Sequence, residues 1–168
     1  MNTTFGYKIL MVAVAAIPLV MLSAYVVISL TGDANPEKEH YEAGLQLHQQ
    51  GHFRPAIEEY DKSISLNGGG ALAYAKRGDA YYALREFDLA MADYGRAISM
   101  RGDLVPRLGS PGYLSVKQAL AESYMGRAMV YTELGRDLDA QRNAGQAIDF
   151  GYGEDLAREK LDEIKSWR

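Results

Sequence analysis

The chain has 168 residues, enough for one ordinary domain plus an appendage, and carries a formal net charge of −4. This acidic balance argues against a nucleic-acid binder, because no basic stripe is available to neutralise phosphates. The absence of cysteine excludes disulfides, thiol nucleophiles and thiolate metal sites, and is compatible with an oxidising or a reducing compartment.

An uncharged stretch, Ile9–Leu30, follows a short N-terminal tail of residues 1–8. At about 1.5 Å per residue, a helix of this length crosses a hydrocarbon layer about 30 Å thick, so we predict a transmembrane helix that contacts the lipid bilayer through residues 9–30. The alternative is a cleaved signal peptide, since Lys8 precedes the stretch and small residues lie within it. We favour the anchor, because a cut after Ala24 would leave an apolar mature end.

The charges on either side of this stretch predict its orientation. Lys8 lies on the short side, whereas Asp33, Glu37 and Glu39 lie on the other. The positive-inside bias therefore predicts a single-pass membrane protein with a cytoplasmic N-terminus and its main domain on the outer side, periplasmic or extracellular. Because this rests on one lysine, a domain facing the cytosol remains the alternative.

After a linker over residues 31–35, the chain repeats itself. Seven positions of the first copy recur 34 residues later, as Gly44 and Gly78, Leu47 and Tyr81, Phe53 and Phe87, Ala56 and Ala90, Tyr60 and Tyr94, Ile64 and Ile98, and Gly68 and Gly102. Seven positions of the second copy recur 50 residues later, as Tyr74 and Tyr124, Arg77 and Arg127, Tyr81 and Tyr131, Leu84 and Leu134, Ala90 and Ala140, Ala97 and Ala147, and Ile98 and Ile148. Such self-similarity indicates stacked repeats rather than one globular core.

The pattern resembles the tetratricopeptide repeat, whose signature combines a large residue, a Leu-Gly pair and an aromatic with a second helix that carries Ala, an aromatic and a closing Pro. The second copy supplies Tyr74, Arg77-Gly78, Tyr81, Ala90 and Tyr94. The departures are Arg77 and Arg127 in place of Leu, Gly68, Gly102 and Tyr152 in place of Pro, and Ala128 and Ala144 in the third copy. The resemblance implies an all-α domain over residues 36–168, with three helical hairpins and a capping helix in a right-handed α-solenoid.

The repeat boundaries follow from the matched positions. We expect repeats at about 37–70, 71–104 and 121–154, with the first hairpin formed by a helix ending near Gln50 and another over Pro55–Leu66. Small residues should meet where the paired helices cross, Gly44 against Ala56 and Gly78 against Ala90. The cap should span 155–167, with Ala157, Leu161, Ile164 and Trp167 on one stripe.

The period is broken by an insertion over residues 101–115. Its prolines and glycines argue against helix, and Ser115 with Gln118 three residues later is typical of a capping box, so the next helix should begin at Ser115 and end near Leu134. A segment of this length is either functional or loosely ordered.

No catalytic motif is present, so we predict no enzyme activity and no cofactor. His48 and His52 have a metal-like spacing, but Gly51 separates them at a helix end, so they need not share a face. We therefore predict no metal site.

The resemblance also implies a binding surface, because first-helix residues line the inner face of such repeats and ligand peptides lie across it. The implied positions are Tyr41, Leu45, His48, Ala75, Asp79, Tyr82, Met125, Met129 and Thr132. They lack the Lys, Asn and Arg set that chaperone-binding members use to hold a terminal carboxylate, and tyrosine with methionine suits an apolar or helical segment. Binding through the outer face is the alternative.

These features favour a protein–protein interaction scaffold anchored in a membrane, as an accessory or assembly subunit of a membrane-protein complex. The alternative is a secreted or peripheral peptide-binding module whose N-terminal stretch is cleaved.

Overall fold

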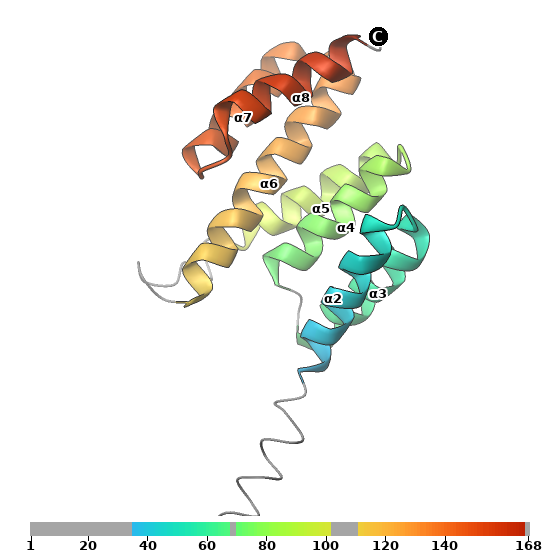
Figure 1. The fold of residues 1–168 in the computed structure, drawn as a ribbon. Coiled ribbons are helices and arrows are strands. Elements are labelled where there is room, and N and C mark those ends of the chain that lie inside the picture. The colour runs from blue at the N-terminus through green and yellow to red at the C-terminus, as the bar shows by residue number, and fades with distance from the viewer. Residues whose placement is uncertain (1–34, 68–69, 102–110, 167–168) are drawn as a thin grey trace, which may run out of the picture. The chain divides into compact units, whose positions relative to one another are not determined.

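The computed structural model describes residues 35–67, 70–101 and 111–166. The helices in these ranges are α2 (Pro36–Gln49), α3 (Phe53–Asn67), α4 (Ala71–Ala83), α5 (Phe87–Ser99), α6 (Pro111–Glu133), α7 (Asp137–Asp149) and α8 (Glu154–Ser166). No strand occurs among the described residues, which confirms the all-α prediction for this part of the chain. Figure 1 shows the hairpins α2/α3, α4/α5 and α6/α7 following one another, with α8 beside α7.

The chain divides into two compact units, Met1–Asn35 and Pro36–Arg168. The predicted membrane helix over residues 9–30 lies outside the described residues. Within the ranges that are described, no helix is both long and apolar enough to cross a membrane. Helices α2 to α8 all lie in the second unit.

The three hairpin turns have the same backbone geometry. Gly51, Arg85 and Gly135 occupy equivalent positions and have φ values of 78°, 59° and 73°. In each turn, the amide of this residue donates to a carbonyl three residues earlier, and the next amide donates to a carbonyl five residues earlier. Glycine adopts positive φ without steric cost, whereas arginine does not. Arg85 has a positive φ because it occupies the same turn position as the two glycines and its turn makes the same two hydrogen bonds. The shared turns lie 34 and 50 positions apart, the same two spacings at which the sequence repeats.

Each of the first two hairpins is packed around a buried tyrosine. A Cβ atom on Gly44 would lie 2.7 Å from Cδ1 of Tyr60, and one on Gly78 would lie 2.8 Å from Cε1 of Tyr94. The atoms nearest to these added Cβ atoms belong to the tyrosine rings and not to Ala56 and Ala90, the partners expected from the sequence. The alanines are fully buried, but the ring one turn further along the second helix is what presses on the glycine.

Two helices begin earlier than the sequence indicated, for the same reason. α3 begins at Phe53 rather than Pro55, and α6 begins at Pro111 rather than Ser115. Proline is tolerated in the first turn of a helix, where its missing N–H would have no partner in any case. The capping-box prediction was wrong: Ser115 lies inside α6, and the Gln118 amide donates to the Glu122 carboxylate over 2.9 Å.

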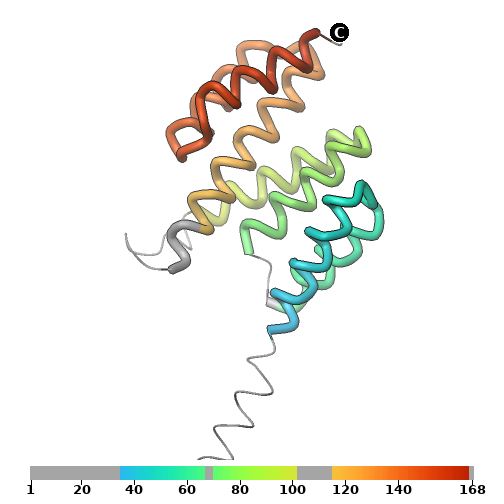
Figure 2. Tube along the Cα trace, viewed as in Figure 1, coloured from blue at the N-terminus to red at the C-terminus, as the bar shows by residue number. Residues whose placement is uncertain are grey.

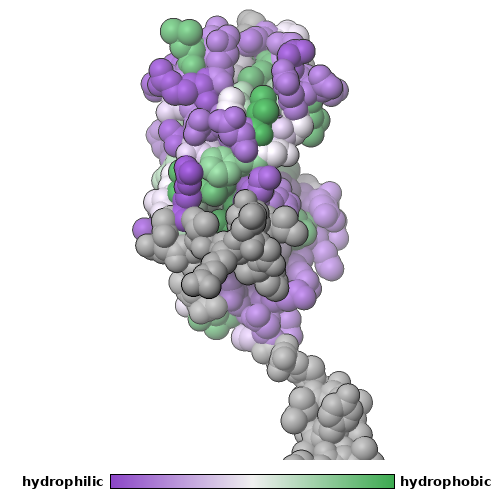
Figure 3. Space-filling model, turned by 90° about the vertical axis from the view of Figure 1, so that its left-hand side faces the viewer, coloured by the Kyte–Doolittle hydropathy of each residue, from purple (hydrophilic) through white to green (hydrophobic). Residues whose placement is uncertain are grey.

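The capping helix α8 packs against α6 and α7. Ala157, Leu161 and Ile164 are buried as predicted, whereas Trp167 lies outside the described residues. The path of the chain runs from α2 to α8 without returning to an earlier hairpin (Figure 2). The face drawn in Figure 3 is mainly hydrophilic, with small separate hydrophobic areas. The fold is consistent with a solenoid of tetratricopeptide type, and its handedness stays a prediction.

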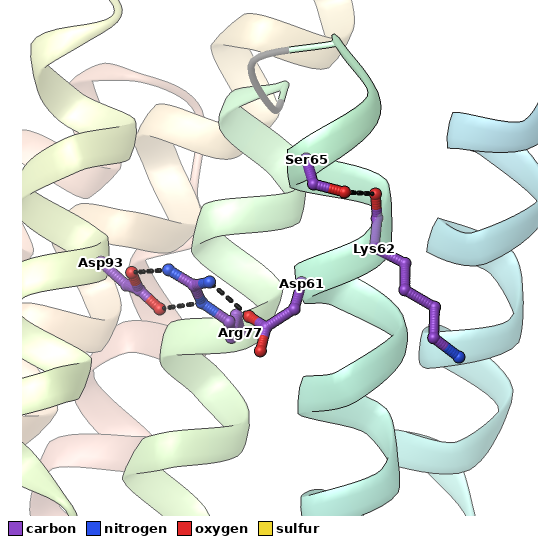
Figure 4. A network of polar contacts seen from close by, with 5 residues as sticks. All are labelled: Asp61, Lys62, Ser65, Arg77 and Asp93. Atoms are coloured by element: carbon purple, nitrogen blue, oxygen red, sulfur yellow. Dashed lines mark hydrogen bonds and ion pairs between the residues drawn. The ribbon is translucent and has the colours of Figure 1, made fainter.

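An arginine joins the first two repeats. Arg77 on α4 donates from Nε and Nη2 to the two carboxylate oxygens of Asp93 on α5, over 2.8 and 2.7 Å, and from Nη1 to Asp61 on α3 over 2.5 Å (Figure 4). The hydrogen bonds to Asp93 raise the pKa of Arg77, so the guanidinium stays charged. One side chain therefore ties three helices together.

Candidate partner-binding groove

A groove of about 370 Å³ crosses all three hairpins and reaches the cap. We call it the central groove. Its lining comprises His48 of α2, Phe53 of α3, Lys76, Asp79, Tyr82 and Ala83 of α4, Tyr94 of α5, Glu122, Met125, Gly126 and Met129 of α6, Tyr152, and Lys160 of α8. Helices α2 to α6 and the cap α8 all contribute to this lining, and Tyr152 lies between α7 and α8. The groove therefore depends on the stacking of the repeats.

The structure brings together five of the nine positions implied by the sequence. His48, Asp79, Tyr82, Met125 and Met129 line the central groove. Tyr41 and Leu45 are half-buried and lie outside its lining.

Two of the nine positions are wrong as lining residues. Ala75 is fully buried in a cluster of alanines from α4, α5 and α6, because α6 packs against α4 there. Thr132 is also fully buried, and its hydroxyl donates to the Ala128 carbonyl over 2.9 Å. Neither side chain is accessible to a ligand.

The charged part of the groove was missed. Lys76, Glu122 and Lys160 lie in the lining, but none was implied by the family positions. A signal was present: Lys160 follows Gly126 by 34 residues, and Gly126 follows Lys76 by 50, so all three are equivalent. Extending the repeat register into the cap would have identified Lys160.

Tyr94 forms the floor where the second and third repeats meet. Its ring presses on Gly78 within its own hairpin, and a Cβ atom on Gly126 of α6 would lie only 2.2 Å from its Cζ atom. The hydroxyl donates to the Asp79 carboxylate over 2.9 Å. Gly126 thus lets α6 approach the ring closely, and Met125 and Met129 of the same helix also line the groove.

Lys76, one of the two lysines that line the central groove, is paired with two carboxylates. Lys76 Nζ lies 3.3 Å from Asp79 and 3.1 Å from Glu122. Burial alone would lower the pKa of Lys76, but the charges of these two carboxylates outweigh it and raise the pKa to about 12. Burial also raises the pKa of Asp79. Lys76 therefore stays charged and is already neutralised by its neighbours, so it is poorly placed to hold the carboxylate of a ligand.

The charged side chains of the lining are Lys76, Lys160, Asp79 and Glu122, two of each sign, so the groove is close to neutral. Burial lowers the pKa of His48, so its ring is uncharged at neutral pH. Burial, together with the charge of Glu133, raises the pKa of Tyr82 to about 12, so its hydroxyl stays protonated. Phe53 and Met129 add apolar surface. Such a wall suits apolar side chains that present few polar groups.

Comparison with known families agrees with this geometry. Residues 71–104 match the family model described as tetratricopeptide repeat. The match covers the second hairpin, α4 and α5, which is also the copy with the fullest signature. The shared turns extend the same architecture to α2/α3 and α6/α7. This repeat supports a protein–protein interaction role; it is typical of an interaction module rather than of an enzyme. Among the described residues, no group of three His, Asp or Glu side chains is placed to hold a metal ion.

Proposed function

We propose that the protein is a membrane-anchored scaffold that holds an apolar or amphipathic helical segment of a neighbouring membrane protein in the central groove. The observation that carries the proposal is a groove whose lysine Lys76 is already paired with acids and whose accessible apolar side chains are Phe53, Tyr82, Met129 and Tyr152. A ligand gains binding energy there by burying apolar surface, at about 25 cal/mol per Å².

The second element of the proposal is the anchor over residues 9–30, with the repeat domain on the outer side of the membrane. A partner that is itself embedded in the bilayer would contact both the anchor and the groove. Two weak attachments on one chain reinforce each other through effective concentration, so neither contact has to be tight. An accessory or assembly subunit of a membrane-protein complex fits this arrangement.

The anchor is tested by fractionation. Full-length protein should remain in the membrane pellet after carbonate extraction, and mass spectrometry should detect an intact N-terminus. Quantitative release, or a mature end near Ala24, would contradict the anchor and would favour the secreted or peripheral peptide-binding module.

The groove is tested by co-purification under mild detergent, with isotope-labelled quantification of the proteins retained. Tyr82→Ala with Met129→Ala should reduce recovery of the partner, because both side chains line the groove without being fully buried. The matched control is Leu89→Ala with Leu138→Ala, since both leucines are exposed and lie outside the groove lining.

Two outcomes would contradict the groove assignment. Equal recovery with the groove variant and the wild type would show that the partner binds elsewhere, and loss confined to the control variant would point to the outer face. Replacing residues 9–30 by an unrelated membrane helix should weaken recovery independently of the groove variant.

A further inference from the structure

Helix α7 is left partly uncovered at the end of the stack. At the two boundaries between hairpins, α3 packs extensively against α4, and α5 against α6. The capping helix α8 instead packs mainly against α6 and meets α7 over a short contact. A groove of about 340 Å³ runs between α7 and α8, which lie next to each other in Figure 1. We call it the end groove.

The floor of the end groove is apolar and has room above it. Ala144 of α7 and Ala157 and Leu161 of α8 are buried, and Ile148 is half-buried. Gly145 also lines the groove, and a Cβ atom there would meet no described atom within 4 Å. The space at this point is therefore open to side chains from outside the chain.

Charged side chains of α8 line the same groove in a regular order. They alternate in sign along the helix, as Glu154, Arg158, Asp162 and Lys165. Spacings of three and four residues place them on one face of α8. Arg158 pairs with Glu154 over 3.0 Å and Lys165 with Asp162 over 3.9 Å, and these side chains are between 41% and 66% exposed. Because exposed pairs within one helix contribute little stability, the four charges remain available to a partner.

The order of the signs selects one kind of partner. From the N-terminal end of α8 the charges are negative, positive, negative and positive, and from the other end each sign is reversed. An antiparallel copy of the same helix therefore presents an unlike charge to every member of the row, whereas a parallel copy presents like charges. Two copies related by a twofold axis meet through the same surface in this antiparallel way. Such complementarity determines which partner is accepted and in which orientation.

We propose that the end groove is a homodimer interface, in which α8 of a second copy lies antiparallel to α8 of the first. A twofold axis level with Lys160 places Arg158 opposite Asp162 of the second copy. The same axis places Glu154 within one residue of Lys165 of the second copy. The end groove shares no lining residue with the central groove, so dimerisation does not use the residues proposed to hold the ligand there.

Disulfide crosslinking tests the geometry of the dimer. The chain has no cysteine, so only introduced cysteines react. Full-length Arg158→Cys and Asp162→Cys chains, co-expressed and oxidised in detergent, should form a linked dimer because the two positions face each other. Either variant alone should form much less. Two copies of position 158 are offset by about 6 Å along the helices, and this offset, added to the separation across the interface, exceeds the roughly 7 Å between Cα atoms that a disulfide tolerates.

A matched control uses the other side of the same helix. Glu159→Cys with Glu163→Cys has the same four-residue spacing, but both residues are exposed and lie outside the end groove. This pair should stay unlinked. Absence of the disulfide between positions 158 and 162, or equal yields from the mixture and from each variant alone, would overturn the antiparallel dimer. A dimer held through another part of the chain would give one of these two results.

Charge reversal tests the pairing itself, by sedimentation of the purified full chain in density-matched detergent. Arg158→Glu and Asp162→Arg should each raise the dissociation constant of the dimer at least about tenfold, because each places like charges opposite each other. An equimolar mixture of the two variants should recover the wild-type value within about threefold, since unlike charges then face each other again. The control Glu163→Arg should change the dissociation constant by less than about twofold.

Three results of the sedimentation experiment would contradict the proposal. The wild-type chain could remain monomeric, the mixture could fail to recover association, or Glu163→Arg could weaken the dimer as much as Arg158→Glu. If the chain is monomeric and Arg158→Glu instead lowers recovery of a co-purified protein, the end groove binds that protein and not a second copy. The purified chain contains no ligand of the central groove, so failure here leaves the proposed function untouched.

Discussion

Replacing Gly126 by alanine tests the closest contact between two repeats. The added Cβ atom would lie 2.2 Å from Cζ and 2.5 Å from Cε1 of Tyr94. Carbon atoms in ordinary contact are about 3.5–4.0 Å apart, so the ring would have to move by more than about 1 Å. It cannot do so freely, because Gly78 presses on it within its own hairpin and its hydroxyl is held by Asp79.

The size of the effect follows from three contributions. Overpacking costs about 1–3 kcal/mol. Disturbing the hydrogen bond from Tyr94 to the Asp79 carboxylate costs about 1.5–3 kcal/mol. Alanine favours a helix interior over glycine by about 1 kcal/mol, which offsets part of the loss. We expect Gly126→Ala to lower the free energy of unfolding by about 2–4 kcal/mol.

Gly145→Ala in α7 is the matched control. Gly145 also lies within a helix, but a Cβ atom there would meet nothing within 4 Å. This variant should therefore gain about 0.5–1 kcal/mol from helix propensity alone. Urea unfolding followed by circular dichroism should give shifts of opposite sign for the two variants. Unchanged or increased stability in Gly126→Ala would show that Tyr94 does not hold the two repeats together as described.

Three further predictions concern the buried core, the groove residue His48 and the ion pair between Arg77 and Asp93. Ala90→Leu should cost about 1–3 kcal/mol because Ala90 is fully buried, whereas Ala92→Leu, at an exposed position, should change the urea midpoint little. Burial lowers the pKa of His48, so the unfolded chain binds a proton at this ring more readily than the folded chain. The free energy of unfolding should therefore fall as the pH drops below about 6.5. His48→Gln should reduce this loss in urea titrations at pH 7.5 and 5.5. Arg77→Met should cost about 3 kcal/mol by leaving the buried Asp93 unpaired, and adding Asp93→Leu should recover much of it in thermal unfolding.

The number and placement of the hairpins could be predicted because the repeat signal rests on many positions at one spacing. Helix α4 was expected from Ala71, and the structure begins it there. The start of α6 could not be predicted from Ser115, since local capping rules do not distinguish a cap from a serine inside a helix that a proline has already begun. The residue at which a helix begins depends on which of several nearby residues starts it, here Pro111 or Ser115. The repeat period depends on many positions and is not affected by this choice.

The groove was harder to predict than the fold. His48 and Tyr82, two of the family positions, line the central groove, but these positions assume that each first helix presents the same face to the ligand. Ala75 breaks this assumption because α6 packs over it, and Thr132 breaks it because its hydroxyl turns back to its own helix. Which side chains remain accessible is decided by packing between repeats, and a pattern within one repeat does not contain that information.

The third repeat departs from the signature in a physically consistent way. In the first two hairpins, the crossing glycine makes room for a tyrosine, as Gly78 does for Tyr94. The equivalent residues of the third hairpin are Ala128 and Ala144, which belong to one buried cluster. With no ring at position 144, position 128 has no need of glycine. A glycine of α6 stands two residues earlier, at Gly126, where it faces the tyrosine of the preceding repeat. The third hairpin thus has alanines where the first two have a glycine and a tyrosine, and the closest approach of α6 lies at the boundary with the preceding repeat, where Tyr94 and Gly126 both line the central groove.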